Sequence, residues 1–230
     1  APFIIAAILG IINMISVYFL LPETHTSNRL QVRKLTPLKA FSNIRIAFTD
    51  KEASHVCRVN FFYFAGFAFF TSFSGLYLVQ KYAIGEAELG KYFAAIGIWI
   101  VITQTLILRF VSKYGTPLQV LRKSMILVAI ASTLTPFMPT LFLQYVLIPC
   151  IAIPQGLSMA NLTALLSSTI SKERQGVALG INGSLSALSQ GIVPLAGGII
   201  GGLFGVRIPF IIGGMCIFYA WYSVRSFTMK

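Results

Sequence analysis

Long stretches without a charged side chain run through this sequence and restrict what it can fold into. Asp, Glu, Lys and Arg are absent from residues 1–22, 59–80, 92–108, 124–171, 175–206 and 208–224. A hydrocarbon core of about 30 Å is crossed by about 20 apolar residues in helical conformation. Each run can therefore form one membrane-spanning helix, and 124–171 is long enough for two. The sequence predicts an all-α fold, a polytopic transmembrane helical bundle with seven spans.

The run 124–171 needs a turn near its middle, and one segment provides it. Pro136 and Pro139 both lie within residues 135–140. Proline has no amide hydrogen to donate and disrupts a helix interior. We therefore expect a hairpin turn at 135–140 between two spans.

The basic residues are unevenly divided between the two sides of the predicted membrane. Of the 18 Lys and Arg residues, the side of the C-terminal tail holds all but Lys81, Lys91 and Arg207. Cytoplasmic loops are enriched in Lys and Arg, so the C-terminus is expected to be cytoplasmic. A nucleic-acid-binding face would not alternate with the spans, and we expect no nucleic-acid partner despite the net charge of +12.

Composition and the lack of motifs argue against a soluble protein and against an enzyme. Charged residues make up 10% of the chain and hydrophobic residues 56%, whereas soluble domains contain about 25% charged residues. The two histidines, His25 and His55, lie outside the spans, and the three cysteines lack metal-type spacing. We expect no catalytic residues, no metal and no cofactor.

The span interiors contain no ionisable Asp, Glu, Lys, Arg or His, so a binding site would be built from uncharged polar and aromatic groups. Helical spacing places Asn60, Tyr63 and Phe67 on one face of the span 59–80. The full set of candidate substrate-binding residues is Asn60, Tyr63, Phe67, Trp99, Gln104, Gln155, Asn182 and Gln190. For each of them, packing against another helix or against lipid is the alternative.

Small residues and prolines mark two further features of the spans. A stripe in the span 175–206 should let a neighbouring backbone approach closely; it comprises Gly176, Gly180, Gly183, Ser184, Ala187 and Gly191. The glycines of the segment 197–202 are expected to serve the same purpose. Pro149 and Pro154 free backbone carbonyls at membrane depth, which indicates either a binding site in a mobile helix or a static kink.

One span, a long basic loop and six further spans resemble the major facilitator superfamily from its sixth helix onward. Phe19-Leu20-Leu21-Pro22-Glu23-Thr24 resembles the end of helix six in the drug/proton antiporter branch, and 161–198 resembles its helix 10 to 11 region. Of the Gly-x-x-x-Asp-Arg-x-Gly-Arg-Arg motif, only Lys113 and Gly115 are matched. The resemblance implies that 1–22 is the truncated last helix of an N-terminal half. It further implies that 23–58 is a cytoplasmic interdomain loop and that 59–230 is a C-terminal six-helix transporter domain.

The resemblance implies a secondary active transporter, a multidrug efflux antiporter that works by alternating access on small amphipathic or drug-like molecules. Its protons would pass through the missing N-terminal half, and its other partners would be a small-molecule substrate and membrane lipids. The expected location is a plasma membrane, of the bacterial inner-membrane type. The alternatives are an importer of sugars or other metabolites with the same fold, and a transport-deficient receptor or scaffold.

Overall fold

A computed structural model describes residues 2–20, 54–169 and 175–225, which form helices joined by short turns. The chain separates into two units, Ala1–Thr36 and Pro37–Lys230, and each is described by itself. Most of the interdomain loop predicted at 23–58 lies outside the described residues, as do the connection 172–174 and the end of the C-terminal tail.

The first unit contains one helix, α1 (Pro2–Leu20). It coincides with the first charge-free run of the sequence. Its apolar part, Ile4–Leu20, is slightly shorter than each of the six apolar helices of the second unit.

The second unit contains six helical rods that are long and apolar enough to cross a membrane. They are α3 (Ser54–Tyr82), α4 (Glu86–Ile102) continued by the π-turn η1 (Thr103–Ile107) and α5 (Leu108–Val111), α6 (Pro117–Leu134) with the 3-10 turn η2 (Thr135–Phe137), α7 (Leu141–Thr169), α8 (Gln175–Phe204) and α9 (Ile208–Arg225). Hydrogen bonds within a helix satisfy the backbone without water, as a membrane interior requires. The predicted helical bundle and the turn at 135–140 are both confirmed.

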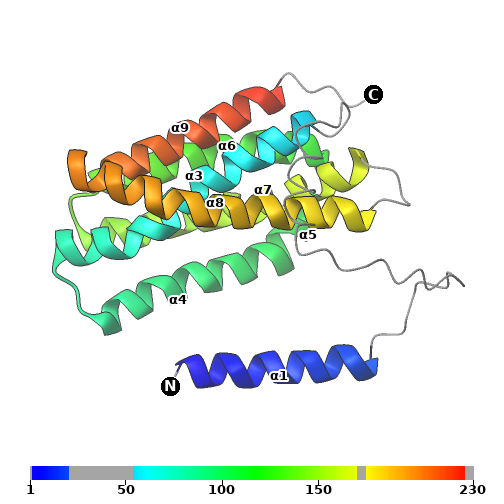
Figure 1. The fold of residues 1–230 in the computed structure, drawn as a ribbon, viewed down its shortest axis with the longest axis horizontal. Coiled ribbons are helices and arrows are strands. Elements are labelled where there is room, and N and C mark those ends of the chain that lie inside the picture. Colours follow the sequence, from blue (N-terminus) through cyan, green and yellow to red (C-terminus); the bar gives the residue numbers. More distant parts are fainter. Residues whose placement is uncertain (1, 21–53, 170–174, 226–230) are drawn as a thin grey trace, which may run out of the picture. The chain divides into compact units, whose positions relative to one another are not determined.

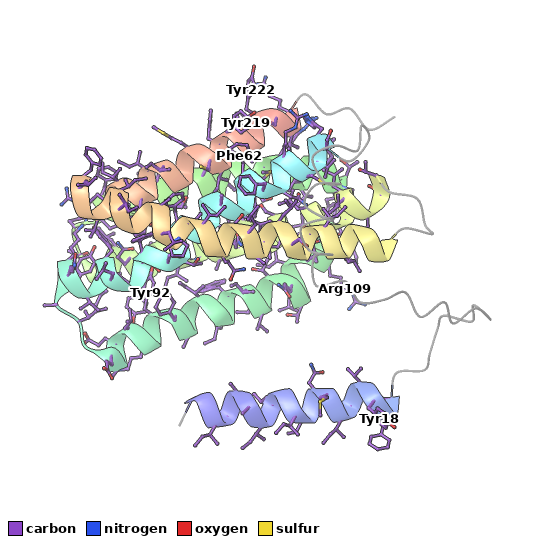
Figure 2. The ribbon with its side chains drawn as sticks, viewed as in Figure 1. Tyr18, Phe62, Tyr92, Arg109, Tyr219 and Tyr222 are labelled. Carbon is purple, nitrogen blue, oxygen red and sulfur yellow. The ribbon has the colours of Figure 1, made fainter. Side chains whose placement is uncertain are left out.

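The core of the second unit lies around α3. Helix α3 packs against α8 and α9, α6 packs against α7 and α9, and α4 packs against α7 (Figure 1). The backbones of α3 and α9 approach so closely that a Cβ atom at Gly66 would lie 2.5 Å from the carbonyl oxygen of Gly213. Further along the same pair, the rings of Phe62 and Tyr219 meet edge to face with centroids 4.6 Å apart (Figure 2).

The ends of several helices are closed by specific hydrogen bonds. The hydroxyl of Thr116 accepts from the amide of Gln119 at 3.3 Å, and the Gln119 side chain accepts from the Thr116 amide at 3.2 Å. This reciprocal capping box starts α6. Helix α8 ends at Gly205, whose φ of +93° suits a glycine and whose amide donates to the carbonyl of Gly201 at 2.9 Å.

A network of hydrogen bonds connects the end of α3 to the turn between α6 and α7. Lys81 donates from its ammonium to the carbonyls of Pro136, at 3.3 Å, and Met138. The hydroxyls of Tyr77 and Tyr82 donate to the same two carbonyls, at 2.7 and 2.6 Å respectively. The Lys81 ammonium also lies 5.3 Å from the centroid of each tyrosine ring. The hairpin is thus held by side chains of a third helix.

Two sequence expectations need correction. The helices extend beyond the charge-free runs: α3 begins at Ser54 instead of residue 59, because an exposed Arg58 can project from a helix end. In the small-residue stripe of α8, a Cβ atom at Gly176, Gly183 or Gly191 would meet no heavy atom within 4 Å. No described residue therefore packs closely on those three glycines.

The glycines at 197–202 give a mixed result. A Cβ atom at Gly197 would collide with the rings of Phe73 and Phe69 on α3, so this glycine does permit close packing. Gly198 and Gly202 have nothing within 4 Å. Close approach is therefore confined to one side of α8.

Candidate substrate cavity

A cavity of about 320 Å³ lies among α3, α7 and α8. Its lining comprises Phe64, Phe67, Ala68, Thr71, Gln155, Met159, Ser186 and Gln190. Three of the candidate residues, Phe67, Gln155 and Gln190, are thereby brought together from three different helices. Aromatic and apolar walls with a few polar groups are typical of small-molecule sites.

The lining residues come from the middle of their helices. Gln155 is the central residue of the 29-residue α7, and Ala68 is the central residue of the 29-residue α3. Gln190 lies next to the centre of the 30-residue α8. The cavity therefore lies near the middle of the length of these helices, which are long enough to cross a membrane.

Tyr63 supports Gln155 from behind the cavity wall. Its hydroxyl donates a hydrogen bond to Oε1 of Gln155, and its side chain is fully buried. The carbonyl side of the Gln155 amide is thereby held, which orients the amide. Pro154 precedes Gln155 within α7 and cannot donate to the carbonyl of Cys150, so one helix hydrogen bond is missing beside the cavity.

A second polar pair joins α3 to α8. Nδ2 of Asn60 donates to Oδ1 of Asn182 at 2.9 Å, and Nδ2 of Asn182 lies 3.5 Å from Oγ1 of Thr163 on α7. The Asn60 side chain is buried, and its Oδ1 has no hydrogen-bond partner among the described residues. Asn60 and Asn182 therefore connect helices, which is the alternative that the sequence left open for them.

The structure places Trp99 and Gln104 away from this cavity. Trp99 packs against the cluster formed by Leu78, Ile84, Tyr92, Ile148 and Ala152, which come from α3, the turn after it, α4 and α7. Gln104 lies in the π-turn η1 and is exposed. Tyr92, labelled in Figure 2, is buried in the same cluster as Trp99.

The π-turn adjoins a close contact between α4 and α7. The hydroxyl of Thr103 donates to the carbonyl of Trp99 at 2.7 Å, and a Cβ atom at Gly156 would lie 2.9 Å from Thr103 Cγ2. A π-turn inserts one extra residue into a helix and shifts the faces that follow. Gln104 is exposed, as are Val101 and Leu106 on the same helical rod.

Five lining residues were not among the candidates, and helical spacing contains a signal for three of them. Thr71 follows Phe67 by four positions, Met159 follows Gln155 by four, and Ser186 precedes Gln190 by four. Residues four apart share a helix face. The hydroxyl of Ser186 also accepts from Nε2 of Gln190 at 3.1 Å. The other two, Phe64 and Ala68, lie three positions before Phe67 and one position after it.

A bundle of helices long and apolar enough to cross a membrane, with an uncharged cavity at mid-height, is the architecture of a multi-pass membrane protein. The family model of the Major Facilitator Superfamily matches residues 1–192 and, in a second match, residues 56–227. The chain belongs to the Major Facilitator Superfamily, a family of transporters and not of enzymes.

Among solved structures, the chain is similar in fold to the human organic anion transporter MFSD10 (TETRAN). The TM-score is 0.66 at 16% sequence identity, over 80% of this chain and 46% of that one. The chain thus spans less than half the length of that relative. No curated protein matches the chain.

Proposed function

We propose that this chain contributes one wall of the substrate pathway of a secondary active transporter that exports small amphipathic or drug-like molecules by alternating access. The observation that carries the proposal is the uncharged cavity at the midpoint of α3, α7 and α8. Secondary transporters bind substrate near the bilayer midplane and expose that site to each side in turn. The mid-helix position of the cavity and its uncharged lining support this role.

The lining supports an uncharged or amphipathic substrate. Phe64, Phe67 and Met159 offer apolar contact, while Gln155 and Gln190 offer amide groups for hydrogen bonds. MFSD10 is an organic anion transporter. The cavity lining described here includes no Lys, Arg or His that would pair with an anion, so we favour neutral solutes.

We propose proton coupling through carboxylates outside this chain, in an N-terminal half of the transporter. In the described residues, Glu86 and Glu88 are the only carboxylate side chains, and both lie in the first turn of α4. They are at the end of a helix and not at the cavity. Proton relays within membranes are usually built from buried ionisable side chains. We also propose a plasma-membrane location with a cytoplasmic C-terminus, on the basis of the charge distribution.

The test uses a full-length transporter that carries this chain, reconstituted in liposomes with a pH gradient. We expect efflux of a neutral amphipathic dye that follows the gradient and stops when an ionophore removes it. Gln155→Leu should weaken transport of the dye, whereas Gln104→Leu, on the exposed π-turn, is the matched control and should not. No flux responsive to the gradient would refute the proposal. Saturable uptake of a sugar would select the importer, and binding without turnover would select the receptor.

A further inference from the structure

A second apolar feature follows the seam between α6 and α7, apart from the substrate cavity. Two cavities of about 480 and 460 Å³ share the residues Leu127, Ile153 and Pro154. The first extends from these residues toward Tyr114 and Lys123, and the second toward Leu134 and Leu147. Together they form one continuous depression, which we call the α6–α7 groove.

The part of the α6–α7 groove between Lys123 and Leu134 corresponds in length to one leaflet of a membrane, about 16 Å at the rise of about 1.5 Å per residue. The lining on α6 continues past Lys123 to Gln119, at the end of the groove that carries the cation. One leaflet contributes about half of a hydrocarbon core of about 30 Å. The groove walls consist mainly of side chains such as Leu127, Ile130 and Ile153. An occupant must therefore be apolar over most of its length.

One end of the groove is cationic, and the other is not. Lys123 and Tyr114 are exposed at the first cavity, whereas the second cavity is lined by apolar side chains and Cys150. Arg109 lies in α5 and Lys113 in the connection between α5 and α6, and Figure 2 shows Arg109 near that end of the unit. The segment 109–123 contains no Asp or Glu.

The described carboxylates lie far from this cationic end. Glu86 and Glu88 are in the first turn of α4, and the span Glu86–Val111 separates them from the connection to α6. No ion pair from a described carboxylate to Lys123 exists at this distance. The groove thus combines an apolar slot one leaflet long with a cation at the level of a membrane surface.

We propose that the α6–α7 groove binds one acyl chain of an anionic phospholipid from the surrounding membrane, with its phosphate paired to Lys123. Basic pockets between membrane helices attract anionic headgroups, and the side of the basic connections is the one expected to face the cytoplasm. A neutral lipid would leave the cation without a partner. This inference does not depend on transport.

The experiment is native mass spectrometry of the purified chain in detergent, with equal amounts of phosphatidylglycerol and phosphatidylcholine that have identical acyl chains. We expect phosphatidylglycerol to be retained preferentially. Lys123→Ala should reduce its retention about fivefold, the effect of one cation near a membrane surface, and leave phosphatidylcholine unchanged. Lys91→Ala, an exposed lysine on α4, is the matched control and should have no effect.

A second pair of variants tests the apolar slot. Leu127→Trp should fill the groove and lower retention of both lipids, whereas Ile98→Trp, on an exposed face of α4, should lower neither. In the unmodified chain, phosphatidylglycerol with a photoreactive group in its acyl chain should label residues 127–134 and 147–154, which requires no variant to fold.

Several results would overturn the proposal. These are equal retention of the two lipids, equal effects of the two lysine variants, and photolabelling spread over α4 and α9 instead of α6 and α7. Displacement of phosphatidylglycerol by free palmitate with the same dependence on Lys123 would assign the groove to a free fatty acid and reject the phospholipid.

Discussion

The contact between α3 and α9 allows a sharp test of how the second unit is held together. A Cβ atom at Gly66 would lie 2.5 Å from the carbonyl oxygen of Gly213 and 2.5 Å from Cγ1 of Ile217. Conversely, a Cβ atom at Gly213 would lie 2.7 Å from the carbonyl oxygen of Gly66. A backbone carbonyl cannot rotate away as a side chain does. Gly66→Ala must therefore push the two helices apart.

The magnitude follows from two opposing effects. Overpacking a tight contact costs about 1–3 kcal/mol, and the backbone obstacle at Gly66 favours the upper end. Alanine is about 1 kcal/mol more favourable than glycine in a helix interior. Gly183→Ala gains the same helix propensity, but its Cβ atom meets nothing within 4 Å. The difference between the two variants, about 3 kcal/mol, therefore isolates the cost of the α3–α9 collision.

The assay is unfolding of the purified chain in mixed micelles with increasing dodecyl sulfate, followed by circular dichroism. We expect Gly66→Ala to unfold at a lower dodecyl sulfate fraction than the unmodified chain, and Gly183→Ala at an equal or higher one. If the two variants unfold at the same dodecyl sulfate fraction, the close approach of α3 and α9 does not contribute as reasoned here.

Three further predictions concern the polar groups of the bundle. Lys81→Met should destabilise the bundle by about 1.5 kcal/mol, because the α6–α7 turn loses its ammonium donor. Amide hydrogen exchange in that turn should become faster, and the control, Lys91→Met, should change neither the stability nor the exchange. Tyr63→Phe should weaken substrate binding to the full-length transporter about threefold, measured by equilibrium binding, because the cavity glutamine loses its orienting hydroxyl. A double-mutant cycle with Asn60→Ala and Asn182→Ala should give a coupling of about 0.6 kcal/mol in the unfolding assay, and additivity would contradict the hydrogen bond between them.

The sequence predicted the spans well because charge exclusion from a membrane interior is a property of each segment alone. Choosing a functional face was harder, since periodicity says which residues share a face but not which neighbour that face meets. Phe67 and Gln190 line the cavity. Trp99 was chosen by the same helical spacing, but it packs against other helices.

Two features had no local signal in the sequence. The π-turn at Thr103–Ile107 shifts the faces of the residues that follow it, whereas a spacing argument assumes a regular helix. The stripe of small residues on α8 indicated close packing, yet Gly176, Gly183 and Gly191 meet no described residue within 4 Å. The rings of α3 press against α8 at Gly197, outside that stripe. A glycine shows that approach is possible, and only the arrangement of the partners decides whether it occurs.

Helix α4 is attached to its unit by little buried surface. Within Glu86–Ile102, Tyr92 is the one buried residue, and the other side chains of α4 that pack on the same cluster are only partly buried: Leu89, Ala95, Ile96, Trp99 and Ile100. Partly buried side chains oppose rolling of the helix less than buried ones do, whereas the contact of Thr103 with the bare backbone of Gly156 is close. We therefore expect α4 to tilt about this point while α3, α6 and α7, tied by Lys81, stay fixed. A spectroscopic label on the outer face of α4 would then report motion that the same label on α3 would not.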